Sequence, residues 1–121
     1  MVVGIDSIEI DSIEKSVKSK RFVERVYGPN EQAELQGVPD SARAQRCAAL
    51  FAAKEAFSKA LGTGVRGFSL SQVEVLHENS GKPYLFLSGN AKEIAEETGY
   101  SFSVSITHTK SVATAIVIGY K

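Results

Sequence analysis

The stretch that decides the fold is Phe51-Ala52-Ala53-Lys54-Glu55-Ala56-Phe57-Ser58-Lys59-Ala60-Leu61, followed by Gly62-Thr63-Gly64. Its alanines favour a helix, and Gly62 suits the position just past a helix end. Glu55 follows Phe51 by four residues and Cys47 by eight, so we expect this row to face the protein. A buried carboxylate needs a partner. That partner is either Lys59, one turn later, or a metal ion.

Helix and strand patterns alternate on both sides of this stretch. We expect strands at residues 1–6, 70–77, 84–88, 102–107 and 112–118. We expect one helix capped by Asp11 or Ser12 and running to about Val26, one capped by Ser41 and running to Leu61, and two more at 30–35 and 90–98. The turns at 79–83 and 109–111 predict two hairpins. The fold class that follows is α+β, with a largely antiparallel sheet packed against one long helix.

Length and composition exclude several classes of protein. The chain has 121 residues, 43% of them apolar, which suits a single domain over residues 1–121. Fourteen basic residues balance fourteen acidic ones, so net charge gives no sign of nucleic-acid binding. The only cysteine is Cys47, so no internal disulfide forms. With no membrane-spanning apolar run and no signal-peptide pattern, we expect a soluble, cytoplasmic protein.

Several polar residues are candidates for chemistry. Asp6 ends the first strand, and an acid there is often only a cap or a loop residue. Glu55 with a lysine at i+4 is usually a simple ion pair, and His108 at a strand end is usually structural. Gly62-Thr63-Gly64 is either a helix stop or a cradle for phosphate. Two acids and a lysine together favour a hard cation that holds a phosphate, as Mg²⁺ does.

One segment is strongly basic although the chain is neutral. Between Lys15 and Arg25 there are five basic residues and one acid, Glu24, a local charge of +4. Such a segment is usually a solvated helix face, but it also attracts an acidic protein partner. The near absence of aromatic residues disfavours nucleic acid.

Three motifs, in order along the chain, resemble the signatures of the holo-acyl carrier protein synthases, the small bacterial 4′-phosphopantetheinyl transferases. They are Gly4-Ile5-Asp6 with Ile8-Glu9-Ile10, the stretch from Phe51 to Gly64, and Val104-Ser105-Ile106-Thr107-His108-Thr109-Lys110 continuing into Ala113, Ala115, Val117 and Ile118. Gly81-Lys82-Pro83 before an apolar strand also fits this family. Together the motifs span nearly the whole chain.

The resemblance implies an enzyme of fatty acid biosynthesis. Members transfer the phosphopantetheine arm of coenzyme A to a serine of apo acyl carrier protein and release adenosine 3′,5′-bisphosphate. Mg²⁺, with Mn²⁺ as the alternative, is then held by Asp6 and Glu55, and Lys59 is placed near phosphate oxygens.

The resemblance also assigns the coenzyme and carrier surfaces. Residues expected to contact coenzyme A are Gly62, Thr63, Gly64, Ser105, Thr107 and His108. Residues expected to dock the acidic carrier are Lys15, Lys18, Arg21 and Arg25. Members of this size are typically homotrimers with sites at subunit interfaces, and no nucleic acid or membrane takes part.

The chain departs from the family pattern at two places. Many members have arginine where this chain has Leu50, so that coenzyme-binding role has passed to Arg43 or Arg46 or is lost. Asp11-Ser12 stands where a basic residue is common, which weakens part of the expected carrier contact. Two other functions stay open: a catalytically silent carrier-binding module and a phosphate-binding regulatory domain. The presence of both Asp6 and Glu55 favours the enzyme.

Overall fold

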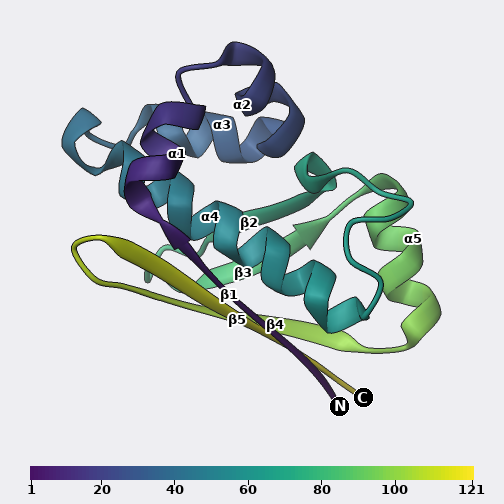
Figure 1. Cartoon of the computed structure of the whole chain (residues 1–121). Coiled ribbons are helices and arrows are strands. Elements are labelled where there is room, and N and C mark those ends of the chain that lie inside the picture. The colour runs from purple at the N-terminus through teal and green to yellow at the C-terminus, as the bar shows by residue number, and fades with distance from the viewer.

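A computed structural model describes all residues from 1 to 121 (Figure 1). Its elements are β1 (Val2–Glu9), α1 (Ile10–Ser16), α2 (Lys20–Val26), α3 (Pro29–Gln36), α4 (Asp40–Leu61), a 3₁₀ turn η1 (Leu70–Gln72), β2 (Val73–His77), β3 (Pro83–Leu87), α5 (Gly89–Thr98), β4 (Ser101–His108) and β5 (Val112–Tyr120). The α+β class with one long helix, α4, is confirmed. No helix combines the length and the apolar character that crossing a membrane requires.

All strand pairs are antiparallel, as expected, but the strands divide into two sheets. A three-stranded sheet has the order β1-β5-β4, and β2 pairs only with β3. In the first sheet Asp6 lies opposite Ala115, which lies opposite Ile106 on β4. Both expected hairpins, β2–β3 and β4–β5, are confirmed.

Helix α4 lies across one face of the three-stranded sheet, while α1, α2 and α3 gather at one end (Figure 1). Small residues permit this close contact: Ala52, Ala53 and Ala56 are completely buried. On the strand side, a Cβ added at Gly4 would collide with the Ala56 carbonyl oxygen. The missing side chain at Gly4 therefore lets β1 touch the helix backbone.

The opposite face of the three-stranded sheet carries no helix (Figure 1). Val3 and Ile5 on β1 are 59% and 57% exposed there. Alternation along the strands places Ile116, Ser105 and Thr107 on this same outer face.

Four expectations about element ends are wrong. Strand β1 continues to Glu9, so Asp6 lies within the strand and not at its end. The first helix is two helices, α1 and α2, separated by a turn after Ser16, and Ser19 rather than Asp11 or Ser12 supplies a side-chain cap. Helix α4 begins at Asp40 without a side-chain cap from Ser41. The strand expected from Leu70 begins only at Val73, after the 3₁₀ turn. The expected stop of α4 at Gly62 is confirmed by its left-handed φ of 81°.

Candidate active site

Asp6, Glu55 and Lys59 come together where β1 crosses α4. Asp6 lies on the helix-facing side of β1, two residues after Gly4. Because Gly4 rests against Ala56, the Asp6 carboxylate reaches the helix surface that carries Glu55 and Lys59. The expected convergence of these three side chains is therefore present in a single chain.

Lys59 pairs with Asp6 rather than with Glu55. Its Nζ donates to Asp6 Oδ1 and to the Ile5 carbonyl oxygen, both at 3.0 Å. The Lys59 side chain is 56% exposed. Asp6 is the more buried partner, with 18% of its side chain exposed. An ion pair whose lysine is solvated typically contributes about 1 kcal/mol or less. The lysine can therefore leave Asp6 at little cost when another anion approaches.

The surroundings of Glu55 disfavour the ionised form of its carboxylate. Burial raises its pKa, the negative charge of Asp6 raises it further, and Lys59 lowers it only in part. The expectation of a buried row through Phe51 and Glu55 holds only in part, since both residues are half-buried. Two carboxylates that repel each other at one edge of a sheet form a natural site for a cation.

The donor set fits Mg²⁺ or Mn²⁺ bound together with a phosphate. No group of three or more histidine, cysteine, aspartate or glutamate side chains could enclose a metal in this chain. Mg²⁺ commonly takes one or two carboxylates and completes its shell with water and substrate phosphates. Asp6 and Glu55 match that pattern.

The loop after α4 exposes Gly62, Thr63 and Gly64. The Gly62 amide is used in capping, since it donates to the Lys59 carbonyl at 3.0 Å. The amides of Thr63 and Gly64 donate no backbone hydrogen bond. Two of the three expected phosphate-binding residues therefore offer free N–H groups, one turn beyond Lys59.

His108 lies in a separate pocket of about 220 Å³ between α4, the β2–β3 hairpin and the end of β4. Arg46, Leu50 and His77 line the same pocket. This arrangement separates the two arginine candidates. Arg46 lies one helical turn before Leu50 beside His108, whereas Arg43 donates to the Val38 carbonyl at 3.3 Å and lines a different pocket.

Ser105 and Thr107 are not brought to the acids within one chain. They lie on the outer face of the sheet, whereas Asp6 and His108 point to the helix side. Asp6 and His108 themselves lie on the two edge strands and are offset by two residues along them, so their Cα atoms are about 12 Å apart. The expected coenzyme residues thus divide between the two faces.

The basic segment runs from the end of α1 through α2, and its cationic side chains are exposed. The residues expected to dock a carrier are all among them: Lys15, Lys18, Arg21 and Arg25. Arg21 and Arg25 also line a groove of about 710 Å³ between α2 and the segment 65–71. Phe22 and Phe51, with ring centres 6.1 Å apart, give this groove an apolar floor. We call it the α2 groove.

Sequence reasoning missed a buried polar cluster around Lys54. Lys54, Glu31 and Glu74 are all at most 2% exposed. A signal was present: Lys54 lies on the same helical row as Cys47, Leu50 and Phe57, each of which is buried. A lysine in the middle of an apolar row requires a buried partner.

Comparison with known proteins gives a consistent result. The family model described as the 4′-phosphopantetheinyl transferase superfamily matches residues 2–117. The holo-[acyl-carrier-protein] synthase of Fusobacterium nucleatum is 40% identical over 122 residues, covering 98% of each chain.

Solved structures of similar proteins agree in fold. The crystal structure of holo-[acyl-carrier-protein] synthase from Neisseria meningitidis superposes with a TM-score of 0.90 at 31% identity, and each chain is covered completely. The Helicobacter pylori synthase in complex with coenzyme A gives a TM-score of 0.84 at 33% identity, covering 98% of this chain and 99% of that one.

Proposed function

Because the chain belongs to the 4′-phosphopantetheinyl transferase superfamily, we propose that it transfers 4′-phosphopantetheine from coenzyme A to a serine of apo acyl carrier protein. The serine oxygen bonds to the phosphorus that carries the pantetheine arm. The bond from this phosphorus to the bridging oxygen breaks, and adenosine 3′,5′-bisphosphate leaves. The serine hydroxyl proton passes to a carboxylate or to a water molecule that acts as the general base.

The observation that carries this proposal is the meeting of Asp6, Glu55 and Lys59 at one edge of the sheet. Phosphoryl transfer asks the protein mainly to position the reactants and to stabilise negative charge. A silent carrier-binding module would not need two carboxylates that repel each other on its surface. The coenzyme A complex of a relative with 33% identity supports the same donor.

Asp6 and Glu55 would hold the divalent cation, Mg²⁺ or Mn²⁺. When bound, such a cation supplies neutralisation of the charge on the pyrophosphate. Lys59 then turns its ammonium from Asp6 to a phosphate oxygen, a change that its exposed position permits. The amides of Thr63 and Gly64 add neutral donors next to it.

His108 and Arg46 provide a second cationic region for the coenzyme. They line one pocket, and Arg46 projects from the same helix that carries Glu55 and Lys59. Coenzyme A bears phosphate at both its pyrophosphate and its ribose, so two separated cationic sites suit its length. Many family members have a coenzyme-binding arginine at the position of Leu50, and we assign that coenzyme-binding role here to Arg46 rather than to Arg43.

The exposed basic segment and the α2 groove would receive the acidic carrier. Lys15, Lys18, Arg21 and Arg25 supply the attractive charge, and the apolar floor at Phe22 and Phe51 gives a contact for an apolar side chain. The groove begins on α4 at Phe51, one turn before Glu55, so a docked carrier lies close to the acids.

Three copies would join through the bare outer face of the three-stranded sheet. Val3 and Ile5 are exposed there, and uncovered apolar surface of this kind commonly marks an interface. The same face carries Ser105 and Thr107. In a trimer these hydroxyls would reach coenzyme held by a neighbouring copy, which accounts for their separation from Asp6 within one chain.

The decisive experiment incubates the protein with coenzyme A, Mg²⁺ and an apo carrier protein, and measures the carrier's intact mass. The expected result is a mass gain of one phosphopantetheine group, abolished by a chelator. Carrier binding without a mass gain would instead identify a silent module. Coenzyme binding without carrier binding would identify a phosphate-binding regulatory domain.

A further inference from the structure

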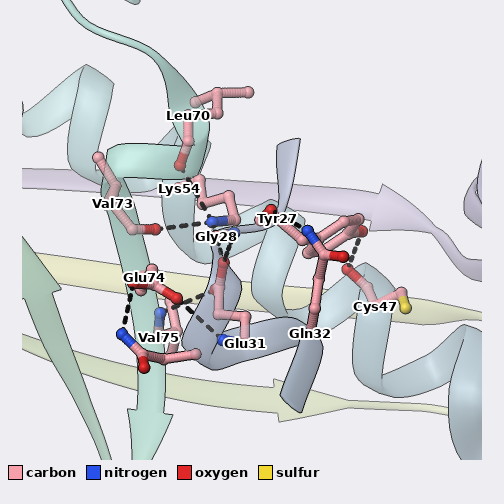
Figure 2. A network of polar contacts seen from close by, with 11 residues as sticks. Tyr27, Gly28, Glu31, Gln32, Cys47, Lys54, Leu70, Val73, Glu74 and Val75 are labelled. Atoms are coloured by element: carbon pink, nitrogen blue, oxygen red, sulfur yellow. Dashed lines mark hydrogen bonds and ion pairs between the residues drawn. The ribbon is translucent and has the colours of Figure 1, made fainter. Parts of the chain in front are cut away.

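Lys54 precedes Glu55 on α4 but faces a different part of the protein. Its side chain is completely buried, and all three of its ammonium hydrogens have partners (Figure 2). Nζ donates to Glu31 Oε1 at 2.5 Å, to the Val73 carbonyl at 2.7 Å and to the Leu70 carbonyl at 3.0 Å. An ammonium has only three donors, so none is left for a phosphate.

Both carboxylate oxygens of Glu31 also accept hydrogen bonds. Its Oε1 also accepts from the Gly28 amide at 2.9 Å, and its Oε2 accepts from the Val75 amide at 2.8 Å. Burial raises the pKa of Glu31 and lowers the pKa of Lys54, and each charge partly offsets the other's shift. A buried ion pair adds little stability over apolar side chains of similar volume. We therefore expect the Lys54–Glu31 ion pair to fix the relative positions of the segments that it joins, and to add little to the free energy of unfolding.

A second carboxylate, Glu74 of β2, fixes the start of α3 (Figure 2). Its Oε2 accepts from the Glu31 amide at 2.8 Å, and its Oε1 accepts from Asn30 Nδ2 at 3.0 Å. A side chain at Gly28 would collide with this carboxylate. Because only Tyr27 and Gly28 separate α2 from α3, the end of α2 is fixed as well.

Both walls of the α2 groove end in this cluster. One wall is α2. The chain continues from α2 to Gly28, and the Gly28 amide donates a hydrogen bond to Glu31. The other wall includes Leu70, and the Leu70 carbonyl oxygen accepts a hydrogen bond from Lys54. The Lys54–Glu31 ion pair is therefore a direct link between the two walls.

The geometry points to Lys54 as a positioning residue for carrier recognition. Together with Glu31 it holds α2 and η1 at the separation that the docked carrier requires. This inference rests on the proposed function, because the α2 groove is the surface assigned there to the carrier. Lys54 acts through the groove and not on the phosphate, even though it adjoins Glu55 in sequence.

The test replaces both charges by neutral side chains of similar size, Lys54→Met with Glu31→Gln, in the full chain. Changing both partners avoids leaving Lys54 or Glu31 without its counter-charge, and Glu74 keeps its hydrogen bonds from Asn30 and the Glu31 amide. We expect the KM for the carrier to rise about tenfold, while kcat and the KM for coenzyme A stay within about twofold. The matched control is Lys92→Met, an exposed lysine on α5, which should change none of these constants.

Amide hydrogen exchange gives a readout that does not depend on activity. In the double variant the amides of residues 69–73 should exchange faster, while the centre of α4 stays protected. Should the double variant not fold, Lys54→Arg is the milder change, because it keeps a positive charge beside Glu31 but cannot reproduce the three hydrogen bonds of the Lys54 ammonium. It should raise the carrier KM in the same direction by about two- to threefold.

Two outcomes would overturn this role for Lys54. One is a fall in kcat of about 10² with an unchanged carrier KM, which would place Lys54 in the chemistry. The other is unchanged kinetics together with unchanged exchange at residues 69–73. Absence of transfer by the wild-type protein would refute the proposed function instead, and the exchange experiment would still decide whether Lys54 holds the groove wall.

Discussion

Gly4 lies against Ala56 so closely that no side chain fits between β1 and α4. Asp6 follows two residues later on the same face of the strand, and Glu55 immediately precedes Ala56. One contact between a glycine and a helix backbone therefore sets the position of two carboxylates that come from distant parts of the chain. Packing and chemistry are coupled at this point.

Gly4→Ala should separate β1 from α4. The new methyl group would overlap the Ala56 carbonyl oxygen, and overpacking of this kind costs about 1–3 kcal/mol or more. We expect a lower free energy of unfolding in urea and a loss of transfer activity. Gly37→Ala is the control, since its methyl group meets only the Glu34 carbonyl oxygen at 3.5 Å and should be tolerated. Full activity in Gly4→Ala would show that the contact does not place Asp6.

Asp6→Asn and Glu55→Gln should each lose activity without unfolding. Each change removes one of the two negative charges proposed to hold the cation, and we expect kcat/KM to fall by about 10² or more. Mg²⁺ with coenzyme A should raise the Tm of the wild-type protein, and this rise should be smaller in both variants. Near wild-type turnover in either variant at saturating Mg²⁺ would disprove the assignment.

Lys59→Met should lower kcat by about 10² if its ammonium stabilises charge on the leaving phosphate. Lys59 is the solvent-exposed partner of its ion pair with Asp6, so the change in Tm should be small. Steady-state kinetics and thermal unfolding on the same preparation separate the two effects. A variant that loses only stability would make Lys59 a structural partner of Asp6.

Glu55 should make stability depend on pH when no metal is present. Its pKa in the folded protein is raised above the ordinary glutamate value of 4.5, so the folded state binds this proton more tightly than the unfolded state. The contribution is most favourable below that value and is lost as pH rises through the folded pKa. Glu55→Gln should therefore gain Tm relative to wild type as pH rises across this window, measured with a chelator. A Tm difference that does not change with pH would contradict this reading.

Local patterns in the sequence predict the elements well, because caps and turns act over a few residues. Gly62 and Gly99 end their helices in the left-handed conformation expected of glycine at that position. The break between α1 and α2 was missed because the basic residues around Ser19 are good helix formers and carry no proline or glycine. Its signal was the serine cap itself.

The sequence predicts which residues form the site, but not which carboxylate forms an ion pair with Lys59. Motifs placed Asp6, Glu55 and Lys59 together, yet which carboxylate takes the lysine depends on how closely β1 approaches α4. The i, i+4 spacing on one helix favours an ion pair between Glu55 and Lys59. The tertiary contact between β1 and α4 instead places Lys59 in an ion pair with Asp6. The buried partners of Lys54 lie 23 and 16–19 residues away, so no local pattern could name them.

Charge reversal of the basic segment, Lys18→Glu with Arg21→Glu, should weaken carrier binding. The segment carries +4 in a neutral chain, and its cations are exposed, so it attracts an acidic partner through solvent. We expect the carrier KM to rise about tenfold or more at low salt, with the KM for coenzyme A nearly unchanged.

Salt is the control for this last effect, because the Debye length is about 8 Å at physiological ionic strength. Raising the salt concentration should increase the carrier KM of the wild-type protein and change that of the double variant much less. Lys92→Glu, at an exposed site on α5 outside the segment, should keep the wild-type salt dependence. If wild type shows no salt dependence for the carrier, or the double variant keeps all of it, the carrier docks on another face of the protein.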